Sequence, residues 1–200
     1  MLAAMLASAS ISHADISVTV FEGVPHPDDA SNPANFSSAL PNAQLTSGAI
    51  NFDSDITGYS VAQFLNNPTF SNPQNGFNSG DTADNIGLLL TGSLFLNAGH
   101  NSFVVEHDDG VTLDINGIGQ VVNAPGPTAP DSTPFDVDAP SAGNYDFTLQ
   151  YTECCGPPAV LVWDINNSPV TVGTPDAAAT MPLLGMGMLG LAAFARRIRK

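Results

Sequence analysis

The stretch "EHDDGVTLDING" (residues 106–117) decides the fold that we predict for this chain. Two adjacent aspartates, Asp108 and Asp109, precede a glycine and a run in which apolar and polar residues alternate. Such alternation is typical of a strand with one buried face, and Asp-Gly is typical of a turn. Adjacent carboxylates repel each other unless water, hydrogen-bond donors or a cation compensates their charge. The stretch therefore predicts two strands around a turn, and it leaves open whether the aspartates only shape this turn or also bind a metal ion.

Further strands are predicted where apolar residues alternate with polar ones or form short continuous runs. The predicted strands are 15–23, 86–99, 100–110, 111–122, 144–153 and 159–165, and the Pro- and Asn-rich segments 24–44, 71–85 and 123–143 are predicted to be loops. No segment between the two ends of the chain has a long 3.6-residue period of apolar residues, which argues against long helices. We therefore predict an all-β fold, a single β-sandwich or barrel with long polar loops over residues 15–172.

The charge of the chain is strongly negative and unevenly distributed. Nineteen Asp and Glu residues oppose four Lys and Arg residues, which gives a formal net charge of −15. All four cations stand near the C-terminus, as Arg196, Arg197, Arg199 and Lys200. Nucleic acid and anionic lipid bind cationic surfaces, so neither is expected as a partner of the folded part, whereas divalent cations and neutral polysaccharides fit an anionic surface. The simpler alternative is an acidic surface that only keeps the protein soluble.

The first 14 residues predict a secretory signal peptide. An apolar run over residues 2–11 is followed by Ser12, His13 and Ala14, a small-x-small cleavage site that leaves Asp15 as the mature N-terminus. A positively charged segment normally precedes such a run, and its absence predicts a start codon further upstream. We therefore expect the protein to be exported.

Residues 173–200 have the layout of a C-terminal sorting signal. Thr174, Pro175 and Asp176 precede a spacer, an apolar run over residues 181–195 and the basic cluster. The run predicts a short transmembrane helix with its cations on the cytoplasmic side. This tail resembles the PEP-CTERM sorting signal, with Asp176 in place of the usual Glu. The resemblance implies recognition by an exosortase in a bacterial inner membrane, transient anchoring by the helix, and a final location at the cell surface or in the extracellular matrix; a plain C-terminal membrane anchor is the alternative.

A second resemblance concerns the middle of the chain. Its residues are Phe103, the turn Asp108-Asp109-Gly110, and the segments 113–117, 142–145 and 151–153. On these positions, residues 59–165 resemble the PA14 domain, a β-sandwich in which loops at one end bind a sugar or a partner. The basic residue and the Trp that many members carry are absent.

The PA14 resemblance also suggests a role for the two aspartates. Some PA14-like lectins, of the yeast flocculin type, join two adjacent aspartates by a cis peptide bond, and both carboxylates face one Ca²⁺ that also binds a sugar diol. The resemblance implies that Asp108 and Asp109 are the carboxylate ligands of calcium. A hard cation needs about six to eight oxygen ligands, and Asp164, Asn166 and Asn167, after the last predicted strand, offer further oxygens. The alternative is a turn in which one Asp accepts backbone N–H bonds.

The chain has only two cysteines, Cys154 and Cys155, and they are adjacent. Thiols of an exported protein tend to oxidise, and Gly156 with two prolines after the pair favours a tight turn. A vicinal disulfide is one prediction, and two reduced thiols or intermolecular bridges are the alternatives. His107, beside the aspartates, is expected to be a polar residue of the turn rather than a metal ligand.

We expect no enzymatic activity. The chain carries no G-x-S-x-G, P-loop or Rossmann glycine motif, and two adjacent Asp side chains share one turn and do not flank a glycosidic bond. The predicted function is noncatalytic: an exported, exosortase-sorted protein of the cell surface or matrix that binds carbohydrate, such as exopolysaccharide, with the help of Ca²⁺. The alternative is a purely structural matrix or adhesion protein without a sugar site.

Overall fold

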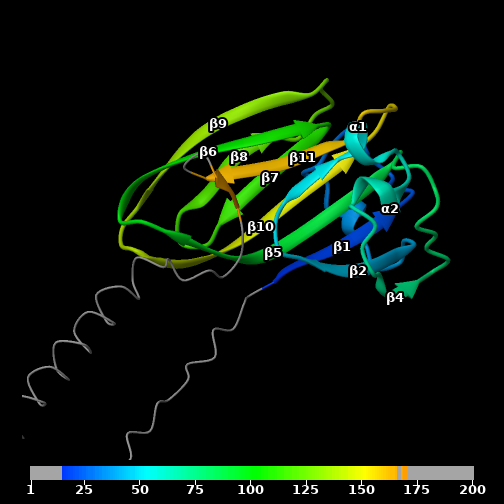
Figure 1. Ribbon diagram of the computed structural model, residues 1–200, viewed down its shortest axis with the longest axis horizontal. Helices are drawn as coiled ribbons and strands as arrows, with labels where there is room; N and C mark the ends of the chain where they lie inside the picture. The colour runs from blue at the N-terminus through cyan, green and yellow to red at the C-terminus, as the bar shows by residue number, and fades with distance from the viewer. Residues whose placement is uncertain (1–14, 166–167, 171–200) are drawn as a thin grey trace, which may run out of the picture. The chain divides into compact units, whose positions relative to one another are not determined.

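The computed structural model describes residues 15–165 and 168–170, and in these residues nearly all regular structure is β (Figure 1). Two antiparallel sheets form a sandwich, as predicted from the sequence. The predicted signal peptide, sorting motif, apolar run and basic cluster lie outside the described residues. Within residues 15–165 and 168–170, no helix is both long and apolar enough to cross a membrane.

The larger sheet has seven strands and the smaller sheet has five. The order of the first is β4 (Ser71–Gln74), β2 (Asn42–Ser47), β1 (Ile16–Glu22), β5 (Ile86–Leu96), β10 (Gly143–Glu153), β7 (Gly110–Ile115) and β8 (Gly119–Ala124). The second runs β12 (Ser168–Pro169), β11 (Val160–Ile165), β6 (Gly99–Asp108) and β9 (Asp131–Ala139), and β3 (Asn51–Asp53) pairs with β11. In the part of the chain that the structure describes, helices are limited to single turns, namely η1 (Pro33–Phe36), α1 (Ser54–Thr57) and α2 (Val61–Phe64).

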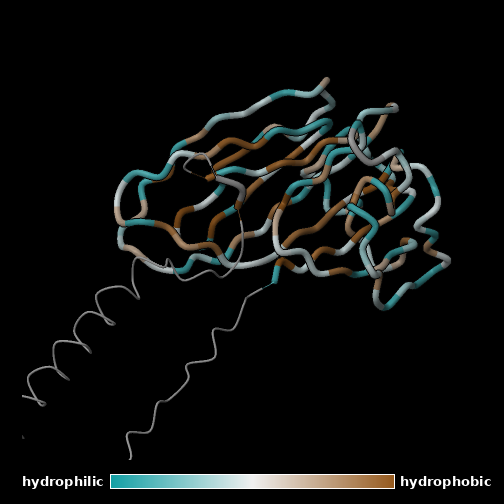
Figure 2. The backbone as a smooth tube through the Cα atoms, in the orientation of Figure 1, coloured by the Kyte–Doolittle hydropathy of each residue, from teal (hydrophilic) through white to brown (hydrophobic). Residues whose placement is uncertain are grey.

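The core lies between the inner faces of the two sheets. Every second residue of β10 faces inward, so that Phe147, Leu149 and Tyr151 are buried. On the facing sheet the indole of Trp163 is fully buried, and its ring meets that of Phe147 edge to face at 5.0 Å. Figure 2 shows the hydrophobic stretches concentrated in the strands, whereas the connecting loops are mostly hydrophilic. The alternation of apolar and polar residues along the strands thus places the apolar side chains in one continuous layer between the sheets.

The opening stretch forms two strands around a turn, as predicted, and the structure adds which sheet each strand joins. Strand β6 belongs to the smaller sheet and β7 to the larger one, so Asp109 is the corner at which the chain crosses between sheets. The peptide bond between Asp108 and Asp109 is cis. The second predicted strand, 111–122, is in fact two strands, because Gly117 has a positive φ of 81° and lets the chain reverse.

Three segments that were predicted to be loops contain strands. Residues 24–44 include the start of β2, 71–85 include β4, and 123–143 include β9. The largest error is β9, which pairs with β6 over nine residues despite Pro134 in its middle. A proline lacks the N–H that a central strand must donate, but β9 is at the edge of its sheet and tolerates it. The prolines and aspartates of this segment hid its strand pattern.

Close packing at the corner predicts a large effect of a small substitution at Gly110. A Cβ atom added there would lie 2.1 Å from the carbonyl oxygen of Pro125, which is itself fixed by accepting a hydrogen bond from the Ala30 N–H. Gly110→Ala should therefore lower the free energy of unfolding by about 1–3 kcal/mol or more, measured by urea denaturation. The matched control is Gly126→Ala, because nothing lies within 4 Å of the added methyl group there. Equal stability of the two variants would contradict the packing described.

Candidate functional site

Three buried carboxyl groups meet at the end of the sandwich where α1 and α2 lie (Figure 1). Asp108, Asp109 and Glu153 each place an oxygen within 4.8 Å of the others. Their residues are 5%, 3% and 0% exposed, respectively. Carboxyl groups are rarely buried unless they are paired, hydrogen-bonded or bound to a metal. We call Asp108, Asp109 and Glu153 the carboxyl cluster and regard it as the candidate functional site.

Strand register brings the third carboxyl group to the pair. Thr152 of β10 lies opposite Gly110 of β7, so the end of β10 reaches the corner at which β7 begins. Leu149 and Tyr151 face the core, and Glu153 is the next residue with the same orientation. Sequence reasoning assigned no site role to Glu153. The signal that could have found it is the alternation of β10, extended by one step.

Asp109 uses both carboxylate oxygens to bind separate segments of backbone. Its Oδ1 accepts a hydrogen bond from the Thr128 N–H at 3.0 Å, and its Oδ2 accepts one from the Cys154 N–H at 2.8 Å. Thr128 belongs to the loop between β8 and β9, and Cys154 directly follows β10. A carboxylate that accepts backbone N–H bonds is typical of a structural turn residue. Each oxygen still has a second lone pair, so a metal ligand role is not blocked.

His107, predicted to be a polar residue of the turn, lies near the end of β6, is buried, and holds the corner by a hydrogen bond. Its Nδ1 lies 2.6 Å from the Asp109 carbonyl oxygen, which can only accept, so Nδ1 carries the proton. In the neutral ring Nε2 then accepts from the Thr133 hydroxyl at 2.9 Å. Both nitrogens are thus engaged by protein groups, and His107 positions the Asp109 backbone. Thr133 was missed because β9 was not recognised as a strand.

Glu153 is held by two tyrosines that the sequence analysis did not place in the site. The Tyr151 hydroxyl contacts the Asp108 carbonyl oxygen and lies 2.7 Å from Glu153 Oε2. The Tyr59 hydroxyl lies 3.3 Å from Glu153 Oε1 and 2.7 Å from Asp84 Oδ1. A hydroxyl has one proton to donate and a carbonyl has none. If Tyr151 donates to the Asp108 carbonyl, the proton between Tyr151 and Glu153 must come from Glu153 itself.

The electrostatics of the carboxyl cluster favour protonated acids. Burial raises the pKa of Glu153 to about 9. Burial, followed by the negative charge of Asp109 and a hydrogen bond to its side chain, raises the pKa of Asp108 to about 7. The sequence of the described residues contains no Lys or Arg, so no such side chain offsets this charge within them. The cluster is therefore neutralised by protons or by a cation from solution.

The two cysteines border the carboxyl cluster and form a disulfide with each other. Cys154 is buried, whereas Cys155 is exposed and has a positive φ of 70°. Both sulfur atoms lie within 4.8 Å of an Asp109 oxygen. A cis peptide bond between Pro157 and Pro158 follows, before β11 begins. The disulfide therefore lies directly beside the carboxyl cluster.

Of the further oxygen donors predicted from the sequence, Asp164 pairs with Val104 of β6 and not with the aspartates. Asn166 and Asn167 lie outside the described residues, so their role stays a prediction. The described end of the same strand is informative. Val160 at the start of β11 pairs with Asp108, whereas Ile165 pairs with Phe103. The start of β11 is thus the end of this strand that adjoins the aspartates.

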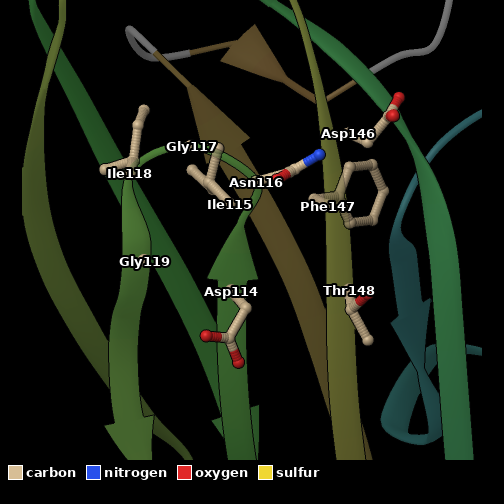
Figure 3. A pocket seen from close by; sticks show the side chains of 9 residues that line it. All are labelled: Asp114, Ile115, Asn116, Gly117, Ile118, Gly119, Asp146, Phe147 and Thr148. Carbon is tan, nitrogen blue, oxygen red and sulfur yellow. The ribbon is translucent and has the colours of Figure 1, made fainter.

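A separate hollow of about 580 Å³ opens at the other end of β7 (Figure 3). It is lined by the turn 114–119 and by residues 146–148 of β10. Figure 3 shows the carboxylates of Asp114 and Asp146 on different strands, with the ring of Phe147 beside Asp146. Both aspartates are exposed, in contrast to the carboxyl cluster. Exposed acids are ordinary on an acidic surface, so we do not assign the function to this hollow.

Comparison with known proteins identifies the fold. No protein-family profile and no curated protein matches the chain. Among solved structures, the PA14 domain of the antifreeze protein MpAFP superposes with a TM-score of 0.58 at 16% identity, covering 79% of this chain and 86% of that domain. The PA14 sugar-binding domain from an RTX adhesin gives 0.58 at 14% identity, covering 82% and 99%. The fold is PA14-like.

A third similar structure is the Epithelial Adhesin 6 A domain from Candida glabrata in complex with Galb1-3GlcNAc. It superposes with a TM-score of 0.50 at 12% identity, covering 83% of this chain and 87% of that domain. At such identities the likeness concerns the fold alone. The PA14-like fold predicted from the DDG stretch is thus supported, and the PEP-CTERM resemblance of the tail stays a prediction.

The raised pKa values predict how stability depends on pH. Folded Glu153 keeps its proton up to about pH 9, whereas an ordinary Glu loses it near 4.5. The folded state therefore binds more protons in this window, and the free energy of unfolding should fall as pH rises through it. Asp108 contributes with the same sign, between 3.8 and about 7.

Glu153→Gln tests this dependence because the amide keeps the shape of the side chain and does not titrate. We expect the wild type, in chelator, to lose at least about 1 kcal/mol of stability between roughly pH 5 and 8, since one pKa unit corresponds to about 1.4 kcal/mol. The variant should lose clearly less, whereas the exposed control Asp114→Asn should follow the wild type. Urea denaturation at each pH measures the three slopes, and parallel slopes would argue against a protonated Glu153.

Proposed function

We propose that this PA14-like domain is a noncatalytic carbohydrate-binding module of an exported protein, and that it binds its glycan through a Ca²⁺ held by Asp108 and Asp109. The observation that carries the proposal is the carboxyl cluster, which combines burial with the absence of Lys and Arg from the sequence of the described residues. A divalent cation would replace the protons that otherwise neutralise the cluster. Calcium prefers oxygen ligands, and carboxylates most of all when charge must be compensated.

The donor set fits a hard cation. Asp108 and Asp109 supply carboxylate oxygens from one corner, and the bonds from Thr128 and Cys154 hold the Asp109 carboxylate in place. Glu153 bonds to two tyrosine hydroxyls, which suits it to positioning Asp108 rather than to direct ligation. Bound Ca²⁺ would supply open coordination positions for two neighbouring hydroxyls of a sugar. Asn166 and Asn167 follow Ile165, which pairs with Phe103 rather than with Asp108, so this proposal does not depend on them.

Similar structures support a glycan as the partner. One is described as a sugar-binding domain from an RTX adhesin, and another was solved with Galb1-3GlcNAc. We further propose export by the N-terminal signal, processing by an exosortase at Thr174, Pro175 and Asp176, and action at the cell surface or in the matrix. The anionic surface of this domain favours a neutral glycan over an acidic one, because like charges repel.

One observation favours the alternative of a structural matrix or adhesion protein. Asp108 and Asp109 are 5% and 3% exposed, so a sugar would have to reach the ion past the loops that cover them. Both carboxylate oxygens of Asp109 are already engaged in holding the fold. In this alternative the carboxyl cluster only stabilises the corner, and adhesion arises from other surfaces.

Thermal unfolding measured at increasing Ca²⁺ concentrations tests the metal site. A ligand that binds only the folded state stabilises it by about 2.7 kcal/mol at a hundredfold excess over Kd. We expect a saturable rise in Tm with Ca²⁺ over chelator in the wild type and in Asp114→Asn, an exposed control on β7. Asp108→Asn should abolish the rise. A rise that persists in Asp108→Asn would locate the ion elsewhere, and no rise would favour the structural alternative.

Glycan binding is tested separately on an array that includes neutral polysaccharides. We expect binding in Ca²⁺ that is lost in chelator and in Asp108→Asn, because the ion would hold the sugar hydroxyls. Binding that is indifferent to both treatments would place the glycan at another surface. Loss of the Tm response together with retained glycan binding would therefore separate the metal proposal from the carbohydrate proposal.

A further inference from the structure

The cysteine pair is the reactive feature of the site that the proposed function does not use. Cys154 and Cys155 are joined, and their sulfur atoms lie within 4.8 Å of an Asp109 carboxylate oxygen. The sulfur atoms come from adjacent residues of one turn and the oxygen from the corner between the sheets. Two sulfurs and a carboxylate are also a donor set for a thiophilic metal ion, once the sulfur–sulfur bond is open.

We propose that reduction turns this cysteine pair into part of a second metal site. In that site the thiolates of Cys154 and Cys155 and the carboxylate of Asp109 bind a thiophilic divalent cation of the Zn²⁺ class. The inference does not rest on carbohydrate binding or on calcium. It uses only the juxtaposition of the three side chains. Three protein ligands leave the fourth tetrahedral position to water or to a further ligand.

The redox step balances with a dithiol as the reductant. The Cys154–Cys155 disulfide takes up two electrons and two protons and becomes two thiols, while the dithiol is oxidised to its own disulfide. Metal binding then forms two metal–sulfur bonds and releases the two thiol protons to solvent. Cys155 is exposed, so a reductant and a hydrated ion can reach the pair from its side.

The position of the third ligand does not depend on the disulfide alone. Asp109 Oδ1 is held by the Thr128 N–H, and the Asp109 carbonyl is held by His107. These contacts come from the β8–β9 loop and from β6, so they persist when the sulfur–sulfur bond opens. The carboxylate therefore stays beside the thiols. The nearby carboxyl groups of Asp108 and Glu153 favour a cation over an anion at this position. No Lys or Arg stands in the described sequence to pair with the thiolates in place of the metal ion.

Cadmium titration of the reduced full chain tests the site. The protein is reduced with a phosphine, freed of it without oxygen, and titrated with Cd²⁺ while the ultraviolet thiolate-to-cadmium charge-transfer band is followed. We expect one ion per chain, and no band for the oxidised protein or for Cys155→Ser. Asp109→Asn should weaken binding at least as much as the about tenfold loss that follows removal of an outer-shell partner. The exposed control Asp114→Asn should bind like the wild type.

A second measurement uses the wild type alone, so its result does not depend on the folding of a variant. X-ray absorption of the zinc-loaded, reduced wild type should show two sulfur neighbours together with oxygen neighbours, and circular dichroism should show that the β-sheet signal is retained. Half an ion per chain, which indicates a metal-bridged dimer, would overturn the proposal. So would unchanged affinity in folded Asp109→Asn, loss of the sheet signal on reduction, or no binding at all. None of these outcomes bears on calcium binding by the oxidised protein.

Discussion

The buried carboxylate of Asp109 is the interaction on which this end of the molecule depends. Its two carboxylate oxygens accept hydrogen bonds from backbone N–H groups of the β8–β9 loop and of the residue after β10. Its carbonyl oxygen accepts a hydrogen bond from the His107 ring. One residue thus ties together the corner between the sheets, the loop that covers it and the end of a central strand. Hydrogen bonds to a charged group are about twice as strong as neutral ones, and losing one leaves buried donors unpaired. The position of every other group in the site follows from this anchor.

The same anchor creates an electrostatic problem that the described chain does not solve with its own cations. Asp108 and Glu153 lie within 4.8 Å of Asp109, and the described sequence has no Lys or Arg. Burial raises the pKa of Glu153 to about 9, and for this reason Glu153 keeps its proton near neutral pH when no cation is bound. A cation that enters must displace the protons of the cluster. The acidic composition of the described chain and the chemistry of the site are therefore linked, because no basic side chain of the described residues offsets the charge of the carboxyl cluster.

Sequence patterns predicted the class of fold and singled out two of the three residues of the carboxyl cluster. Period-two alternation placed the main strands, and the adjacent aspartates marked the corner. Alternation does not say which sheet a strand joins, so the sequence could not show that β6 and β7 lie in different sheets. Glu153 was within reach of the same pattern, as the next inward residue after Tyr151. Tyr59 and Thr133 could not be found from this pattern, because their positions depend on long-range packing. Thr133 also lies on an edge strand, β9, whose prolines made the strand pattern hard to recognise.

The location of the cysteines gives this PA14-like domain a feature that the fold itself does not require. Cys154 follows Glu153 directly, and its backbone N–H is one of the two donors that hold Asp109. The carboxyl cluster and the disulfide are thus neighbours in sequence, in space and in hydrogen bonding. The sulfur atoms also lie within 4.8 Å of an Asp109 oxygen, so the pair adjoins this carboxylate through its side chains as well as through its backbone. Asp109 is therefore linked to the cysteine pair through the Cys154 N–H, whereas its bond from the Thr128 N–H comes from a different segment, the β8–β9 loop.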